Sequence, residues 1–122
     1  MSKYVQWIEY RGKKILVSNY SGLEEKEQIK AMDETKQELL KQPAGSQVLT
    51  LTDVSKARST TTTRDKGKEL EAAIKGKEFV SHTAIVGLSG WQQVMAQLIK
   101  PDSYFAKSIE DAKDWLVEQA GK

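Results

Sequence analysis

Residues 47–65 read QVLTLTDVSKARSTTTTRD. The stretch begins as an apolar, β-branched run of strand length and continues through Asp53 into a polar tract with hydroxyl side chains and two arginines. A helical pattern follows the tract. The order of strand, polar loop and helix indicates a crossover unit of an α/β protein. The near-continuous apolar character of 48–52 predicts a strand inside the sheet, covered on both faces.

Two strand-like runs precede this unit, YVQWIEY at 4–10 and KILVSNY at 14–20. The short turn between them contains a glycine, which adopts positive φ without strain, so the runs predict an opening β-hairpin. Ser21 and Glu24 then have the spacing of a capping box. Apolar residues after them recur on one helical face as far as about Lys41, which predicts the first helix.

Three further helices are predicted, each beginning at a hydroxyl side chain with an acid or amide three residues on. The pairs are Thr62 with Asp65, Ser89 with Gln92, and Ser108 with Asp111. Strand-like runs at 79–86 and around 104–106 precede the second and third of these helices. The predicted order of elements is therefore ββαβαβαβα.

Strands that alternate with helices favour right-handed crossovers between parallel strands. We therefore expect an α/β fold with a single, mostly parallel sheet of four to five strands, an N-terminal antiparallel hairpin and four helices. The chain has 122 residues, which is the size of one ordinary domain, and a single domain over residues 1–122 is expected.

The composition argues against several classes of function. A net charge of +2, from 19 basic and 17 acidic residues, is too balanced for a nucleic-acid-binding face. The chain has no cysteine, and its one histidine, His82, is expected near the start of its strand, away from any site. No metal, cofactor or catalytic triad is therefore expected. With neither a secretory leader nor a long apolar run, a cytoplasmic location is expected.

A binding site is expected where the strands end, because ligands of open α/β sheets collect beyond the carboxyl ends of the strands. Neighbouring strands would bring the two turns after residues 52 and 86 together. The helix N-terminus that follows favours an anion, whose charge arginines could pair. The candidate binding residues are Asp53, Ser55, Arg58, Thr62, Arg64, Ser89 and Trp91. In the alternative interpretation, Thr62 only caps its helix, Asp53 only holds loop amides, and Trp91 belongs to the core.

Four segments together resemble the SpoIIAA-like proteins of the STAS superfamily, which share their fold with bacterial anti-sigma factor antagonists. They are the hairpin at 4–20, LTLTDVS at 49–55, AIVGLSG at 84–90 and SIEDAKDWL at 108–116. The resemblance spans nearly the whole chain. It implies a four- or five-stranded sheet with helices packed against it.

The resemblance also implies two properties of the site. Antagonists of this type are phosphorylated by a partner kinase on a serine of an Asp-Ser-Ser-Gly turn at the start of a helix. The matching positions here are Thr61, Thr62 and Thr63, without the aspartate or the glycine. The SpoIIAA-like branch is also similar to CRAL-TRIO lipid-binding domains, which implies an apolar ligand pocket or membrane-surface contact.

The expected function is a non-enzymatic regulatory or interaction module. It would dock a protein partner or an anionic ligand at the loop and helix N-terminus after the central strand. The alternative is a carrier of a lipid or another apolar small molecule, with peripheral membrane contact. An enzyme that acts on a phosphate ester through Asp53 and the arginines is a third hypothesis. A homodimer through an exposed edge or helix is compatible with each of them.

Overall fold

The computed structural model describes residues 4–57, 60–88 and 102–121, and five strands within them form one mixed sheet in chain order. The strands are β1 (Val5–Tyr10), β2 (Lys13–Asn19), β3 (Gln47–Asp53), β4 (Val80–Val86) and β5 (Tyr104–Ala106). β1 and β2 are antiparallel, and every other neighbouring pair is parallel. The α/β class, the N-terminal hairpin and the mostly parallel sheet are therefore confirmed.

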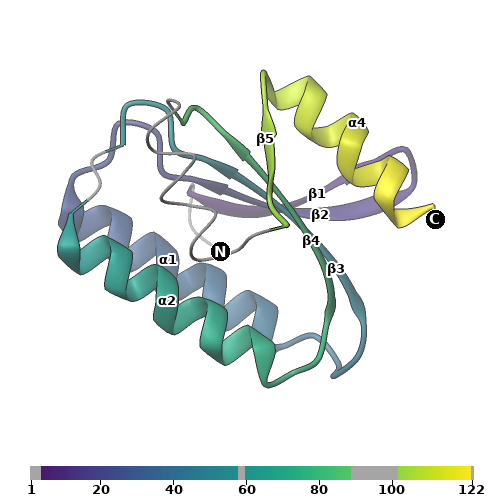
Figure 1. Ribbon diagram of the computed structural model, residues 1–122, viewed down its shortest axis with the longest axis horizontal. Coiled ribbons are helices and arrows are strands. Elements are labelled where there is room, and N and C mark those ends of the chain that lie inside the picture. The colour runs from purple at the N-terminus through teal and green to yellow at the C-terminus, as the bar shows by residue number, and fades with distance from the viewer. Residues whose placement is uncertain (1–3, 58–59, 89–101, 122) are drawn as a thin grey trace.

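Three helices lie in the described residues, α1 (Glu25–Leu40), α2 (Thr61–Lys75) and α4 (Ile109–Ala120). In Figure 1, α1 and α2 lie side by side against one face of the sheet, and α4 crosses the other face. The helix expected after Ser89 falls within 89–101, which lies outside the described residues. A fourth helix therefore stays a prediction.

The two faces of the sheet bury separate hydrophobic cores, because successive strand residues point to opposite faces. Under α1 and α2 the core contains Val5, Leu16, Met32, Leu39, Val48 and Ile74. Under α4 it contains Ile15, Leu49, Leu51, Ala84, Val86 and Leu116. In the middle of β3 the face toward α4 carries Leu49 and Leu51, whereas the face toward α1 and α2 carries Thr50 and Thr52 after Val48. This hydroxyl-bearing part of the sheet lines the cavity described below.

The start of α1 differs from the prediction. Glu24, rather than Ser21, is the residue before the helix, and it makes no side-chain capping bond. The Ser21 amide instead donates to Asn19 Oδ1 at 2.9 Å, and the Gly22 amide donates to the Ser55 carbonyl at 3.1 Å. The segment before α1 is therefore held against the turn after β3, which delays the helix. By contrast, the predicted cap of α4 is confirmed, because the Asp111 amide donates to Ser108 Oγ at 3.1 Å.

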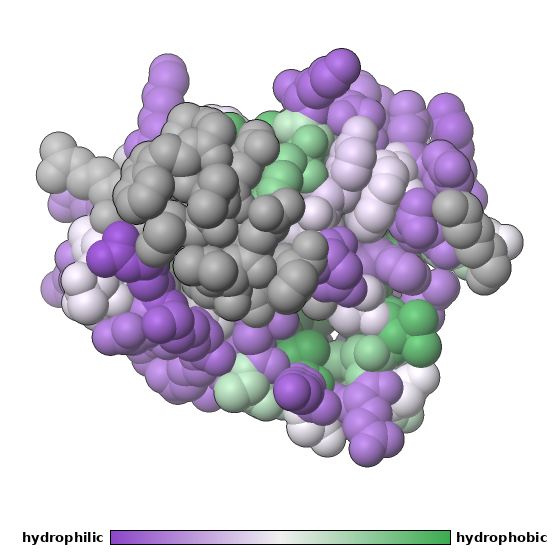
Figure 2. All heavy atoms as spheres, viewed as in Figure 1, coloured by the Kyte–Doolittle hydropathy of each residue, from purple (hydrophilic) through white to green (hydrophobic). Residues whose placement is uncertain are grey.

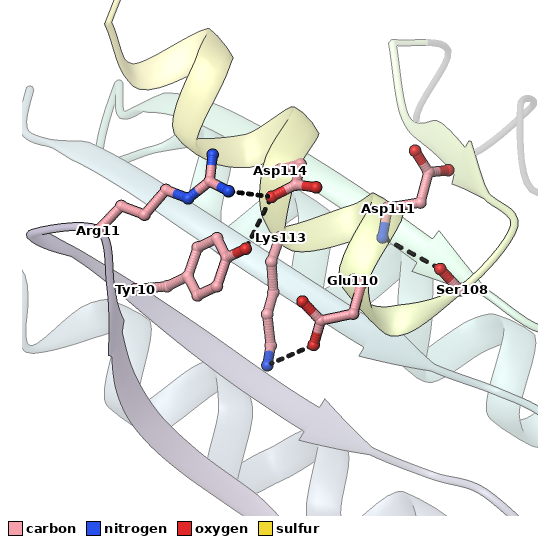
Figure 3. Close-up of polar contacts among 7 residues, drawn as sticks. All are labelled: Tyr10, Arg11, Ser108, Glu110, Asp111, Lys113 and Asp114. Carbon is pink, nitrogen blue, oxygen red and sulfur yellow. Dashed lines mark hydrogen bonds and ion pairs between the residues drawn. The ribbon is translucent and has the colours of Figure 1, made fainter.

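Polar contacts join α4 to the hairpin (Figure 3). The Tyr10 hydroxyl donates to Asp114 Oδ1 at 2.7 Å, and Arg11 pairs with the same oxygen at 3.4 Å. On the same helix, Lys113 lies over the Tyr10 ring at 5.4 Å and pairs with Glu110 at 3.5 Å. Because Arg11, Asp114 and Glu110 are exposed, these ion pairs contribute little to stability, and they mainly orient α4 on the sheet.

A second anchor at the start of α4 predicts a pH dependence of stability. Asp111 Oδ2 accepts hydrogen bonds from the Lys107 amide and the Tyr104 hydroxyl, both at 2.9 Å. These bonds, the Lys107 amide first, lower the pKa of Asp111. A carboxyl group whose pKa is lower in the folded state stabilises the protein above its unfolded pKa. That stability disappears as the pH falls through the folded pKa.

Asp111→Asn is therefore expected to lower the denaturant midpoint near neutral pH, and its difference from the parent protein should shrink below about pH 4. Urea unfolding of both proteins at about pH 7 and about pH 3 measures this. Glu118→Gln, which removes an exposed carboxylate from the same helix, is the control and should show no such change. A difference for Asp111→Asn that is equal at both pH values would contradict the assignment.

Candidate functional site

The ends of β3 and β4 meet at one edge of the sheet, as the sequence predicts. The Val54 amide donates to the Val86 carbonyl at 2.9 Å, and the Tyr20 amide donates to the Asp53 carbonyl at 2.8 Å. We call this edge the carboxyl rim. It comprises residues 53–57, residues 87–88 and the first turn of α2, residues 60–64.

Gly87 brings the two turns of the carboxyl rim into direct contact. Its φ is +98°, and a Cβ at this position would lie 2.6 Å from the Ser55 amide nitrogen and 2.7 Å from Ser55 Cα. Real Cβ atoms do not approach backbone atoms so closely. Glycine is therefore required here both by the backbone conformation and by the space.

Asp53 has a structural role in this turn. Its Oδ1 accepts a hydrogen bond from the Ser55 amide at 2.9 Å, which holds the chain as it leaves β3. Both residues are half-buried. This geometry agrees with the interpretation in which Asp53 holds loop amides, and it leaves the second carboxylate oxygen for any ligand at the rim.

The start of α2 corrects the predicted cap. Thr60, not Thr62, is the N-cap residue: Thr60 Oγ1 accepts from the Thr63 amide at 3.1 Å, and Thr63 Oγ1 accepts from the Thr60 amide at 2.8 Å. Thr63 is buried, at 4% exposure, whereas Thr61 and Thr62 are exposed. The capping box is therefore formed by Thr60 and Thr63, and Thr63 is the threonine that packs into the protein.

Thr60→Ala is accordingly expected to lower the free energy of unfolding by about 1 kcal/mol, and by no more than about 2 kcal/mol, because the Thr63 amide loses its acceptor. Thr62→Ala is the matched control, since the same atoms are removed from an exposed position, and it should change stability by less than about 0.5 kcal/mol. Guanidinium unfolding followed by circular dichroism measures both. A larger loss of unfolding free energy for Thr62→Ala than for Thr60→Ala would show that Thr62 is the N-cap residue, as the sequence suggested.

The remaining candidate residues are placed as follows. Arg64 is half-buried, and its Nη2 donates to Thr61 Oγ1 at 3.4 Å. Three candidates, Arg58, Ser89 and Trp91, lie outside the described residues. The structure thus gathers Asp53, Ser55, Thr62 and Arg64 at the carboxyl rim by way of β3, its turn and α2.

A cavity of about 230 Å³ extends from the rim into the protein, between the sheet and the two helices α1 and α2. Hydroxyl side chains of β3 and β4 line its floor: Thr50, Thr52, Ser81 and Thr83. Apolar side chains of α1 and α2 line its roof: Met32, Leu39, Leu70 and Ile74. Thr63 and Arg64 border it at the rim. The resemblance implies an apolar ligand pocket, but the sequence reasoning did not identify its position or its lining residues, although alternate hydroxyl residues in two apolar strands were a signal for them.

Hydrogen bonds within the protein hold the polar side chains around the cavity. Thr50 Oγ1 and Thr83 Oγ1 are 2.8 Å apart. Thr35 Oγ1 donates to the Ala31 carbonyl and lies 2.8 Å from Ser18 Oγ and 3.0 Å from the Tyr20 hydroxyl. Since Thr35 has one proton, Ser18 and Tyr20 must donate to it. Burial raises the pKa of Tyr20, which keeps its hydroxyl protonated as a donor.

The described residues contain no group of three or more His, Cys, Asp or Glu side chains that could hold a metal ion. No helix in the described ranges is long and apolar enough to cross a membrane. His82 lies near the start of β4, as expected, and its ring meets Trp115 of α4 edge-on with centroids 6.3 Å apart. It therefore packs on the sheet face opposite the cavity.

Few large hydrophobic side chains are exposed among the residues that the structure describes. Figure 2 shows mostly hydrophilic residues on the visible face, with small hydrophobic groups at the upper centre and toward the lower right. Within the described ranges the exposed large hydrophobic residues are Leu40 and Val80, at 37% and 53%. Isolated side chains of this kind are normal on a soluble surface.

No protein-family model, curated protein or solved structure matches this chain. The resemblance to SpoIIAA-like proteins therefore depends on the four sequence segments alone, and it stays a prediction.

Proposed function

We propose that this chain is a non-enzymatic regulatory module, of the STAS type that its sequence resembles, which docks a protein partner or an anionic ligand at the carboxyl rim. The observation that carries the proposal is the placement of Thr61 and Thr62. Both are exposed in the first turn of α2, beside the joined ends of β3 and β4. The first amide groups of a helix have no intrahelical acceptor, and the helix dipole favours negative charge there.

The geometry also supports regulation by phosphorylation. A phosphate on Thr61 or Thr62 would lie at the positive end of α2, and Arg64 already contacts the Thr61 hydroxyl at 3.4 Å. Thr63 is a poor site for phosphorylation, because its hydroxyl is buried and hydrogen-bonded to Thr60. Of the three threonines matched by resemblance, Thr61 and Thr62 therefore remain as candidate phosphorylation sites. Mass spectrometry of protein from its native cells should find phosphate on Thr61 or Thr62, and phosphate on Thr63 alone would contradict this geometry.

Docking can be tested with two variants that introduce the same side chain at opposite edges of the sheet. Thr62→Glu adds bulk and negative charge at the carboxyl rim, whereas Ala44→Glu adds them before β3, at an exposed position. Binding to a partner isolated from native cells should weaken by about tenfold or more in Thr62→Glu and stay unchanged in Ala44→Glu. NMR shift changes on binding should fall on residues 53–57, 60–64 and 87–88. Changes confined to the opposite edge would refute the proposal.

The cavity favours a second candidate function, a carrier of a small apolar molecule. Its apolar roof and hydroxyl floor are typical of ligand pockets, which combine apolar lining with a few polar groups. A volume of about 230 Å³ is smaller than the pockets of drug-sized ligands, which begin at about 300 Å³, so a whole two-chain lipid does not fit. Native mass spectrometry should detect a small co-purifying molecule. Its absence, together with no binding to liposomes, would count against the carrier function.

A further inference from the structure

Two buried polar atoms beside the cavity have no hydrogen-bond partner within the described part of the chain, Gln28 Oε1 and Ser103 Oγ. Both residues line the cavity, and Gln28 is only 7% exposed, but the two oxygens themselves are closed to a water-sized molecule, so each side chain must turn to present its oxygen to the cavity. A third such atom, Glu34 Oε2, belongs to a residue that does not line it. Roughly nine-tenths or more of buried polar groups in native proteins are paired. The two atoms beside the cavity therefore indicate a partner that this part of the protein does not itself supply.

The volume sets the size of that partner. About 230 Å³ is several times the share of one water molecule in the liquid, about 30 Å³, and it exceeds the roughly 150 Å³ of an apolar cavity that binds benzene. One substituted six-membered ring, or an aliphatic molecule of similar size, can therefore enter.

The charges at the cavity indicate a neutral occupant. Among its described lining residues, Arg64 and Glu71 are the charged ones, they have opposite signs, and both belong to α2. Their charges cancel, so the lining offers no net charge to an ion. Burying an ion without a compensating partner costs roughly several kcal/mol, which disfavours a ligand that carries a carboxylate or an ammonium group into the cavity.

The polar atoms define which hydrogen bonds the occupant must make. The carboxamide oxygen of Gln28 can only accept, so it requires a donor. The hydroxyl pair of Thr50 and Thr83 uses one of its two protons internally, which leaves one donor and free lone pairs. Ser103 Oγ can donate or accept. A hydroxyl or N–H group on the occupant satisfies this set, whereas a pure hydrocarbon leaves Gln28 Oε1 unpaired.

We propose that the cavity is a binding site for a neutral molecule of about one ring in size, which packs its apolar part against α1 and α2 and donates a hydrogen bond to Gln28 Oε1 as that side chain turns toward it. This inference deepens the carrier function, on which it rests, by naming the chemical class of the ligand. Thr63 and Arg64 connect this cavity with the carboxyl rim, because both border the cavity and both belong to the first turn of α2.

The test compares three probes of nearly equal size: benzyl alcohol, toluene and benzoate. NMR titration of the intact chain should show benzyl alcohol shifting signals of Thr50, Thr83 and Ile74. Toluene should bind about three- to tenfold more weakly, because one neutral hydrogen bond is missing. Benzoate should bind at least about tenfold more weakly than benzyl alcohol. Equal affinities for benzyl alcohol and toluene, tighter binding of benzoate, or shifts confined to α4 would overturn the proposal.

A matched pair of variants isolates the hydrogen bond. Gln28→Leu removes the unpaired oxygen at similar volume, and it should abolish the preference for benzyl alcohol over toluene while toluene still binds. Gln37→Leu makes the same change at an exposed position of α1 and should keep the preference. A preference that survives Gln28→Leu refutes the assigned acceptor. Thr83→Leu, which fills the cavity, should abolish binding of both probes, and retained binding would refute the site.

The experiments distinguish a failure of the carrier function from a failure of the proposed ligand class. If native mass spectrometry finds no co-purifying molecule but the ranking of the three probes holds, the carrier function fails and the site remains. If a molecule co-purifies but the ranking does not hold, the chemical class proposed here is wrong. Should the Thr83→Leu variant not fold, the ranking in the parent protein and the comparison of Gln28→Leu with Gln37→Leu still decide.

Discussion

Leu51→Ala is expected to lower the free energy of unfolding by about 3–5 kcal/mol. Leu51 is fully buried in the middle of β3, where its neighbours across the sheet are Val17 and Ala84, and it packs in the core beneath α4. Both edges of β3 are hydrogen-bonded to other strands, so the backbone cannot move inward to close the space left by the side chain. Guanidinium unfolding at equilibrium measures the loss.

Leu40→Ala is the control for this prediction. The same atoms are removed from the last residue of α1, where the side chain is 37% exposed. The expected loss is below about 1 kcal/mol. Similar losses for the two variants would mean that the core under α4 is packed far less tightly than the structure indicates.

Gly87→Ala is expected to destabilise the protein by about 2–4 kcal/mol and to displace the turn at Ser55. One part of the loss, about 1–2 kcal/mol, comes from placing a side chain at φ +98°. The rest comes from the overlap of the new Cβ with Ser55 backbone atoms, of which the nitrogen would be 2.6 Å away. NMR shifts of residues 53–57 should change together with the unfolding midpoint, because the carboxyl rim is built on this contact.

Gly45→Ala separates the two parts of this loss. Its φ is +78°, and nothing lies within 4 Å of an added Cβ. The variant should therefore lose only the backbone part, about 1–2 kcal/mol. Equal losses at Gly45 and Gly87 would show that the turn at Ser55 yields without resistance, and the close contact would then have no role in holding the rim.

Local sequence patterns were enough to predict the order of the elements and the type of sheet. The strand-like apolar runs of β2 and β3 and the glycine turn at residue 12 are short-range signals, and the structure follows them. The predicted contact between the ends of β3 and β4 is also confirmed. It followed from topology alone, because parallel neighbours end at the same edge.

The caps were harder to predict, because they depend on tertiary contacts. Residues 60–63 are four successive threonines that are equivalent locally, and only the burial of Thr63 selects Thr60 as the cap. In the same way, Ser21 fits a capping box in sequence. The bond from the Gly22 amide to the Ser55 carbonyl, which joins residues far apart in the chain, shifts the start of α1.

The cavity could not be predicted from either strand alone. Thr50 and Thr52 in β3 and Ser81 and Thr83 in β4 become one floor only when the register pairs Thr50 with Thr83. Its roof comes from two helices that are separated in the chain by β3. The unpaired oxygen of Gln28 depends on the rotamer of a single side chain, which no sequence pattern specifies.

Covering one sheet face with α4 has a consequence during synthesis. The hairpin and the first two βαβ units are complete once β4 has left the ribosome, because neighbouring strands follow one another along the chain. Until residues 109–120 emerge, Ile15, Leu49 and Leu51 remain open to solvent on the far side of that nascent sheet. A translating chain at this stage presents a row of aliphatic side chains to chaperones, and a chain stopped there is expected to aggregate instead of persisting as a smaller folded unit.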